Sequence, residues 1–275
     1  MNEAFGAPEP AYDTLYDTFD SPLAQEVRRE VYAKDIGQHS WVDARELERD
    51  VSGLQLSTSS RLLDLGCGPA GPLTFVLGLV GCRGIGVDIS GAAITSASKR
   101  AVSLGLRERA TLLVADLDEP LDLERESVDA AMSLDVVLHL GDRSRPFAEM
   151  ARVLVPGGRL LFTDAGVVTG AVSNDEIRLR SMHGRTQFVP PGFNERALAQ
   201  AGFRVLDQVD RTASLIAIAA RRLGARRKFQ ARLEAVEGEE GFARQQRYLE
   251  TVLALSQRGA MARMMYLCES RAVAS

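Results

Sequence analysis

A glycine-rich turn at residues 64–71, from Asp64 to Gly71, constrains this chain more than any other feature. It follows a short apolar run at 61–63, which predicts a buried strand, and it precedes an apolar run that predicts a helix start near residue 72. Glycine has no Cβ, so the backbone can approach a ligand closely. A helix N-terminus adds free N–H groups. The turn is therefore typical of a cofactor site.

Two classes of cofactor compete for this turn. Gly66, Gly68 and Gly71 satisfy the dinucleotide fingerprint G-x-G-x-x-G, and Asp88 lies where a ribose partner is expected. Asp64, however, ends the strand where a pyrophosphate would have to sit, and its carboxylate would repel that group. A carboxylate there suits a cation, so we favour a sulfonium cofactor with a free amino group. A dehydrogenase stays an alternative if NAD competes for the same site.

Strand-like and helix-like runs alternate along the middle of the chain. Short apolar runs bounded by turn residues predict strands near 61–65, 83–88, 110–115, 128–134, 158–164 and 203–210. Helical patterns lie between them, near 72–80, 91–104, 144–154 and 193–201. This alternation predicts an α/β fold, with a parallel sheet covered by helices on both faces. Ligands of such sheets bind beyond the carboxyl ends of the strands.

Five motifs in order resemble those of class I S-adenosylmethionine-dependent methyltransferases. They lie at residues 64–68, 86–90, 113–117, 127–133 and 152–162. The resemblance is strong over about residues 55–211 and implies a Rossmann-like, seven-stranded, mostly parallel sheet. It also implies S-adenosyl-L-methionine as cofactor, with Asp88 on the ribose hydroxyls and Asp116 on the adenine amino group. The positions taken as cofactor contacts are Asp64, Gly66, Cys67, Gly68, Asp88, Ile89, Asp116, Leu117, Ser133 and Gln38.

Two segments lie outside this minimal fold. Residues 11–52 predict two or three helices with a turn at Gly37, and residues 222–260 predict a charged helical stretch broken near Gly238 and Gly241. The second precedes a β-like run at 264–268 and resembles an insertion before the last strand. We therefore expect an N-terminal helical lid over 1–52, a cofactor-binding core over 53–211, and the helical insertion with the last strand over 212–275.

The segment 133–140 resembles that of small-molecule N-methyltransferases of the phosphoethanolamine and sarcosine/dimethylglycine type. In that group the Asp contacts the substrate amine and the His pairs with a lid tyrosine. The resemblance thus assigns these roles to Asp135 and His139, with Tyr12, Tyr16 or Tyr32 as the partner; Tyr32 precedes a similar lid segment at 35–41. The alternative is that His139 only hydrogen-bonds backbone and orders its loop.

The sequence says less about the identity of the methyl acceptor than about the identity of the cofactor. Phosphobase enzymes hold a phosphate with tyrosines and basic groups after the fifth strand. This chain has no tyrosine there, and Arg178, Arg180 and Arg185 are interpreted mainly as solvated charges. An aromatic lid predicts a larger, partly apolar acceptor. The candidate substrate contacts are Tyr16, Trp41, His39 and Arg185.

Three functional hypotheses follow. The favoured one is methyl transfer to an amine or activated carbon of a metabolite or natural product, with His139 as general base or orienting group. An O-methyltransferase with the same base is the alternative within enzymes, and a non-catalytic protein that binds S-adenosylmethionine is the third. No catalytic metal is expected. Asp135 and Asp164 lie near the magnesium positions of catechol-type enzymes, but Ala165 replaces the Asn, and such a site needs several oxygen ligands together.

Composition sets the remaining expectations. The 275 residues can bury a full α/β core, and a net charge of −4 favours neither nucleic acid nor an anionic membrane surface. No apolar stretch approaches the roughly 20 residues of a membrane span, and the first residues lack the features of a signal peptide. Three cysteines without metal spacing suit a reducing cytoplasm. We expect a small-molecule partner, and the sequence leaves homo-oligomer formation open.

Overall fold

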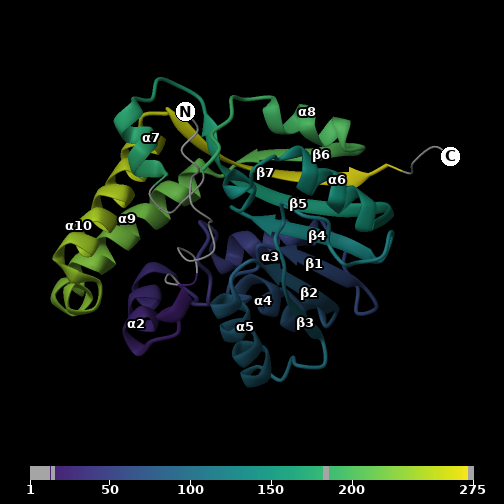
Figure 1. Ribbon diagram of the computed structural model, residues 1–275, viewed down its shortest axis with the longest axis horizontal. Helices are drawn as coiled ribbons and strands as arrows, with labels where there is room; N and C mark the ends of the chain where they lie inside the picture. Colours follow the sequence, from purple (N-terminus) through teal and green to yellow (C-terminus); the bar gives the residue numbers. More distant parts are fainter. Residues whose placement is uncertain (1–12, 14–15, 182–185, 272–275) are drawn as a thin grey trace.

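The computed structural model describes residues 13, 16–181 and 186–271, and these residues form one seven-stranded sheet (Figure 1). The strand order is β3-β2-β1-β4-β5-β7-β6. β7 is antiparallel to β5 and β6, and the other neighbours are parallel. The strands are β1 (Arg61–Leu65), β2 (Arg83–Asp88), β3 (Ala110–Val114), β4 (Val128–Leu134), β5 (Leu154–Val168), β6 (Phe203–Asp210) and β7 (Met261–Ser270).

Helices cover both faces of the sheet because side chains along each strand alternate between faces. Leu62 of β1 packs with α3 (Ala44–Ser52), α4 (Gly71–Val80) and α5 (Gly91–Ser103). Its neighbour Leu63 packs on the opposite face with α6 (Ser144–Val153) and α8 (Phe193–Gln200). A short 3-10 helix, η1 (Val137–His139), follows β4, and α7 (Asn174–Arg180) follows β5. The predicted parallel sheet with helices on both faces is confirmed.

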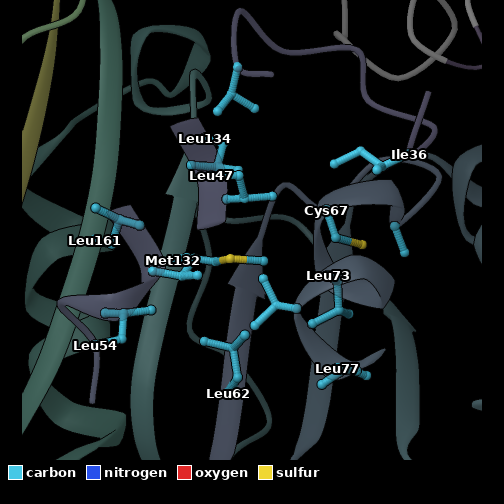
Figure 2. Packing of buried hydrophobic residues seen from close by; sticks show 14 of the residues in the cluster. Ile36, Leu47, Leu54, Leu62, Cys67, Leu73, Leu77, Met132, Leu134 and Leu161 are labelled. Atoms are coloured by element: carbon cyan, nitrogen blue, oxygen red, sulfur yellow. The ribbon is translucent and has the colours of Figure 1, made fainter. Parts of the chain in front are cut away.

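The first core cluster joins the lid segment to the sheet. Figure 2 shows Leu47 of α3 beside Leu134 and Met132 of β4, with Leu73 and Leu77 of α4 on the other side of Leu62. Leu47 is fully buried. Although α3 lies within the segment 1–52, its apolar face is thus part of the main core. The division of the chain into lid, core and insertion stays a prediction.

A third cluster lies beside the sheet, where the lid and the insertion meet. α2 (Pro22–Val31) packs against α9 (Thr212–Lys228), and α9 pairs with α10 (Gln230–Gln257). Val31 and Trp41 of the lid are buried there against Ile218 and Leu249 of these helices. Figure 1 shows α2, α9 and α10 gathered on one side of the sheet.

Most element boundaries agree with the sequence to within a residue or two; the exceptions are the start of the helical stretch, both ends of β5 and the start of β7. The helical stretch begins at Thr212 rather than at residue 222, because α9 follows β6 directly. β5 begins at Leu154 rather than at residue 158, because Leu154 already pairs with Val128 before the register shifts. The predicted break at Gly238 is confirmed by its φ of 74° and ψ of 157°, whereas the helix continues through Gly241. In the lid, the predicted turn residue Gly37 has a φ of +78°.

Within the described residues, none of the helices is both long and apolar enough to cross a membrane.

Replacing Leu47 by Ala should lower the free energy of unfolding by about 2–5 kcal/mol, because it leaves a cavity between α3 and the sheet. Urea denaturation followed by circular dichroism measures this change. Leu79→Ala is the matched control, since Leu79 is 48% exposed and should cost far less. Equal effects of the two substitutions would show that α3 does not belong to the core.

Candidate functional site

A cavity lies beyond the carboxyl ends of β1, β2 and β4, between the lid and the insertion. One end is lined by the glycine-rich turn and by the residues that follow β2 and β3. The other end is lined by the lid loop, η1 and two helices of the insertion. The lining residues from the turn and strands are Asp64, Gly66, Cys67, Gly68, Pro69, Pro72, Asp88, Ile89, Asp116, Leu117 and Asp118. Those that the lid, the residues after β4 and the insertion add to the lining include Tyr16, His39, Trp41, Asp135, His139, Arg222, Gln245 and Tyr248.

The glycine-rich turn has a backbone shape that requires glycine at two positions. Gly66 and Gly68 have φ of +72° and +53°, a region that residues with a Cβ rarely adopt. A Cβ on Gly66 would lie 2.4 Å from Cγ2 of Val136. The N–H of Gly68 donates to Oδ2 of Asp88 over 2.8 Å. This hydrogen bond connects the turn to the end of β2, and residues of both elements line the cavity.

Asp64, the next-to-last residue of β1, is a buried acidic group on the cavity wall. It is only 2% exposed, and its Oδ2 makes no hydrogen bond to any described residue. Burial, with a smaller contribution from the Asp88 carboxylate, raises the pKa of Asp64 well above its usual value. A buried acceptor without a partner is costly. This position therefore suits a ligand that brings a positively charged donor, such as an amino group.

Asp88 and Cys67 both line the cavity, but Asp88 is held by backbone N–H groups whereas Cys67 packs in the core. Burial raises the pKa of Asp88, and the N–H groups of Ser90 and Gly68 partly offset that effect. The carboxylate is thus held in a fixed direction at the end of β2. Burial also raises the pKa of the Cys67 thiol well above its usual value, which disfavours the reactive thiolate form. Cys67 packs with the core cluster in Figure 2, in keeping with a small turn residue.

The insertion supplies residues to the cavity that the sequence did not predict. Arg222 of α9 stacks over the Trp41 ring, 4.4 Å from its centroid. Its Nη2 donates to the Tyr32 hydroxyl over 2.6 Å and to the carbonyl of Ser40 over 3.1 Å. Tyr248 of α10 accepts from Nη1 of Arg180 over 3.0 Å. No pattern in the sequence marks these positions, because they reach the cavity only through the packing of the helical pair against the lid.

Asp135 lies on the cavity wall, but protein groups already engage its carboxylate. Oδ1 accepts from the Thr163 hydroxyl over 2.8 Å and from Nε of Arg263 over 2.9 Å. Oδ2 accepts from the Trp41 backbone N–H over 2.8 Å. Asp135 also has a φ of +61°, a strained value for a residue other than glycine. This geometry favours a positioning role over the predicted contact with a substrate amine.

Three predicted site residues lie outside the cavity lining. The hydroxyl of Tyr32 donates to the carbonyl of Ser40 and accepts from Arg222, and its catalytic role beside His139 stays a prediction. The Gln38 side chain closes its own loop by accepting from the Ile36 N–H over 2.9 Å. The Ser133 hydroxyl donates to the carbonyl of Leu65 over 3.2 Å. In each case a local backbone group satisfies a side chain that was assigned to a ligand or to catalysis.

The remaining predicted residues fall into clear groups. His139, Tyr16, His39 and Trp41 line the cavity, as do the cofactor candidates other than Gln38 and Ser133. His39 packs edge-on against the Tyr16 ring, with centroids 6.1 Å apart. Tyr12 and Arg185 lie outside the described residues. The pairing of His139 with a lid tyrosine stays a prediction.

Two charged residues, Asp164 within strand β5 and Arg180 at the end of α7, are buried. Arg180 is 4% exposed and donates to Tyr248 and to the carbonyl of Ala165, so it is not a solvated helix charge. Asp164 does not line the cavity. It is fully buried and bonds to Arg143 and Asn194, which ties β5 to α6 and α8. That engagement explains why Asp164 does not serve the ligand-facing edge.

Comparison with known proteins defines the class of this fold. Residues 63–162 match the family model described as a methyltransferase domain. The chain is 28% identical to methyltransferase GfsG of Streptomyces halstedii, over 61% of this chain and 66% of that protein. It is also 28% identical to the glycine/sarcosine/dimethylglycine N-methyltransferase of Actinopolyspora halophila, over 60% of this chain and 29% of that protein. The chain therefore matches less than two thirds of the length of these relatives.

The solved structure of the [4+2]-cyclase SpnF is similar along almost the whole chain. It covers 97% of this chain and 98% of its own, with a TM-score of 0.75 and 22% identity. A likeness at this identity supports the fold alone. Together with the family match, the five motifs identify residues 63–162 as a methyltransferase domain of the S-adenosylmethionine-dependent kind. The expected class is confirmed, and the dehydrogenase alternative is not.

Gly66→Ala should weaken cofactor binding, because it forces a strained φ and pushes Val136 away from the turn. The strain alone is worth about 1–3 kcal/mol, or roughly 5- to 150-fold in affinity. Titration calorimetry with S-adenosylhomocysteine measures the loss. Gly78→Ala is the matched control, since a Cβ there meets nothing within 4 Å. An unchanged affinity in Gly66→Ala would contradict the placement of the cofactor on this turn.

Cofactor affinity should rise with pH across the range in which Asp64 loses its proton. The raised pKa of Asp64 means that the free protein keeps this proton above the usual carboxyl range. A cationic amino group can replace the proton, so binding releases it and is favoured as pH increases. Calorimetry at several pH values in buffers of different ionisation enthalpy measures the proton release. In Asp64→Asn the affinity should be lower and this pH dependence should disappear; an unchanged slope would rule out Asp64 as its source.

Proposed function

We propose that this protein transfers the methyl group of S-adenosylmethionine to a small-molecule acceptor held between the lid and the insertion. The observation that carries this proposal is a single cavity that joins the glycine-rich turn to His139, Trp41 and Arg222. The cofactor, when bound, supplies an electrophilic methyl group. The protein residues then have to orient a nucleophile, exclude water and accept a proton.

At the cofactor end, the donor and acceptor set fits each part of the proposed ligand. The unpartnered, buried Oδ2 of Asp64 suits the amino group. Asp88, directed by its bonds to Gly68 and Ser90, suits the ribose hydroxyls. Asp116 is proposed to contact the adenine amino group, with Ile89 and Leu117 against the ring. These assignments rest on the family resemblance and on the position of each residue in the cavity lining.

At the acceptor end, we assign the role of general base or orienting group to His139. It lies on η1, directly after β4, and it lines the same cavity as the cofactor turn. An imidazole can accept a proton near neutral pH, which most other side chains cannot do without a large pKa shift. Trp41, Tyr16 and His39 from the lid, and Arg222, Gln245 and Tyr248 from the insertion, are proposed to contact the acceptor.

The ion pair between Asp135 and Arg263 limits which kind of acceptor nucleophile can bind beside Asp135. Its charge is already balanced by Arg263, so it is a poor site for a cationic ammonium group. An acceptor that approaches His139 as a neutral amine, an activated carbon or a hydroxyl group fits this wall better. Methyl transfer to oxygen therefore stays a full alternative to transfer to nitrogen or carbon. Product analysis by mass spectrometry and NMR separates the three.

His139→Ala should lower the rate of methyl transfer by about 10²- to 10⁴-fold, the range typical of a lost general base. The measurement uses labelled S-adenosylmethionine and an extract of the source organism, with mass spectrometry of the labelled products. Leu79→Ala, at an exposed residue that does not line this cavity, should leave the rate close to that of the wild type. Full activity of His139→Ala with the true acceptor would rule out the proposed base. Cofactor binding with no labelled product from any extract would favour the non-catalytic alternative.

A further inference from the structure

We propose that Arg263 is a positioning residue, which fixes the lid and the β4–η1 turn relative to each other through two buried carboxylates. Arg263 lies on β7 and does not line the cavity, yet its guanidinium contacts Asp135, which does, and Glu46 of the lid helix α3. This inference deepens the proposed function, because it concerns how the acceptor end of the same site is held.

The guanidinium joins three elements that are far apart in the sequence. Its Nε donates to Oδ1 of Asp135, directly after β4, and its Nη1 donates to Glu46 on the lid helix α3. The side chain of Arg263 is fully buried, and those of Glu46 and Asp135 are only 2% and 6% exposed. Although burial lowers it, Asp135 and Glu46 together raise the pKa of Arg263 above its usual value. The arginine is therefore a permanent charge between two acids.

The backbone of Arg263 extends this connection to the insertion. Its N–H donates to the Thr212 hydroxyl over 3.0 Å, and its carbonyl accepts from the N–H of Arg211 over 2.8 Å. Both partners lie at the start of α9. Strand β5 bulges at this point, since Asp164 pairs with Met264 and Val167 pairs with Ala262. Two residues of β5 thus face the single residue Arg263, an irregularity that commonly redirects a side chain.

Asp135 transmits the position of Arg263 to both walls of the acceptor end. Its Oδ2 accepts from the backbone N–H of Trp41 over 2.8 Å, which fixes the lid loop. Its backbone is held in the left-handed region while its N–H donates to Oγ1 of Thr163 over 2.9 Å. The next residue, Val136, packs against the glycine turn at Gly66, and η1 with His139 follows. Without Arg263, Asp135 and Glu46 would be two buried acids with no shared cation.

A strong alternative is that the ion pair only stabilises the fold. Another arginine allows a matched comparison. Arg143 is 1% exposed and pairs with the fully buried Asp164, but it bonds to α8 and to the carbonyl of Gln187 rather than to the lid. Losing either arginine removes a buried ion pair and should destabilise the protein. Only the loss of Arg263 should move the lid loop.

Trp41 makes this difference measurable, because it is the single tryptophan of the chain and is 6% exposed. In Arg263→Met, we expect Trp41 emission to shift to longer wavelength and acrylamide quenching to increase, without any ligand. In Arg143→Met, both properties should stay at the wild-type values under folded conditions. Arg263→Lys keeps the charge but cannot hold two carboxylates in the fixed geometry of a guanidinium, so its quenching should fall between wild type and Arg263→Met.

Several outcomes would overturn the proposal. Wild-type Trp41 emission in Arg263→Met, or equal changes in Arg263→Met and Arg143→Met, would reduce Arg263 to a general stabilising residue. If Arg263→Met does not fold, Arg263→Lys and Asp135→Asn carry the test, and unchanged quenching in both overturns it. Titration with S-adenosylhomocysteine is run in parallel. Failure of the wild-type protein to bind it would count against the proposed function, whereas the Trp41 comparison needs no ligand.

Discussion

The arrangement of the cavity depends on the buried carboxylates at the carboxyl ends of the parallel strands. Parallel pairing of β1 with β2 and β4 brings Asp64, Asp88 and Asp135 to the same edge, where little water reaches them. Each charge needs a partner because desolvation is costly. Asp88 finds backbone N–H groups, and Asp135 finds Arg263 and the Trp41 N–H. Oδ2 of Asp64 has no hydrogen-bond partner among the described residues. This difference distinguishes Asp64, a candidate ligand-binding group, from the two acids that hold the backbone in place.

Three arginines connect the lid and the insertion to each other and to the sheet. Arg263 links β7 to α3, and Arg222 links α9 to the lid loop at Tyr32 and Ser40. Arg211, at the start of α9, pairs with Asp50 of α3. Each of these contacts joins residues more than 150 positions apart. The planar guanidinium suits this task, since it can bond to several oxygens in fixed directions at once. The lid and the insertion are therefore positioned by the same residue type acting on both.

The cofactor end could be predicted from the sequence because its signals are local. Gly66 and Gly68 need a backbone conformation that is visible as a glycine pattern, and Asp64 and Asp88 lie at the ends of strands that show as short apolar runs. The acceptor end could not be predicted in the same way. Among the predicted site residues, Tyr32 at the acceptor and Gln38 and Ser133 at the cofactor do not line the cavity, and their side chains bond to backbone groups or to Arg222. Arg222, Gln245 and Tyr248 reach the cavity only through helix packing, which leaves no motif.

The cofactor end and the acceptor end of the cavity should respond differently to substitutions, because different contacts hold them. The cofactor end depends on φ values and hydrogen bonds within short stretches of chain, so a single substitution such as Gly66→Ala acts directly on binding. The acceptor end depends on pairs between distant elements, in which Asp135 is shared by Trp41, Thr163 and Arg263. Substitutions that share a partner are not additive. Removing Arg263 after Asp135 should therefore change the Trp41 environment less than removing it first, because the connection to the lid is already broken.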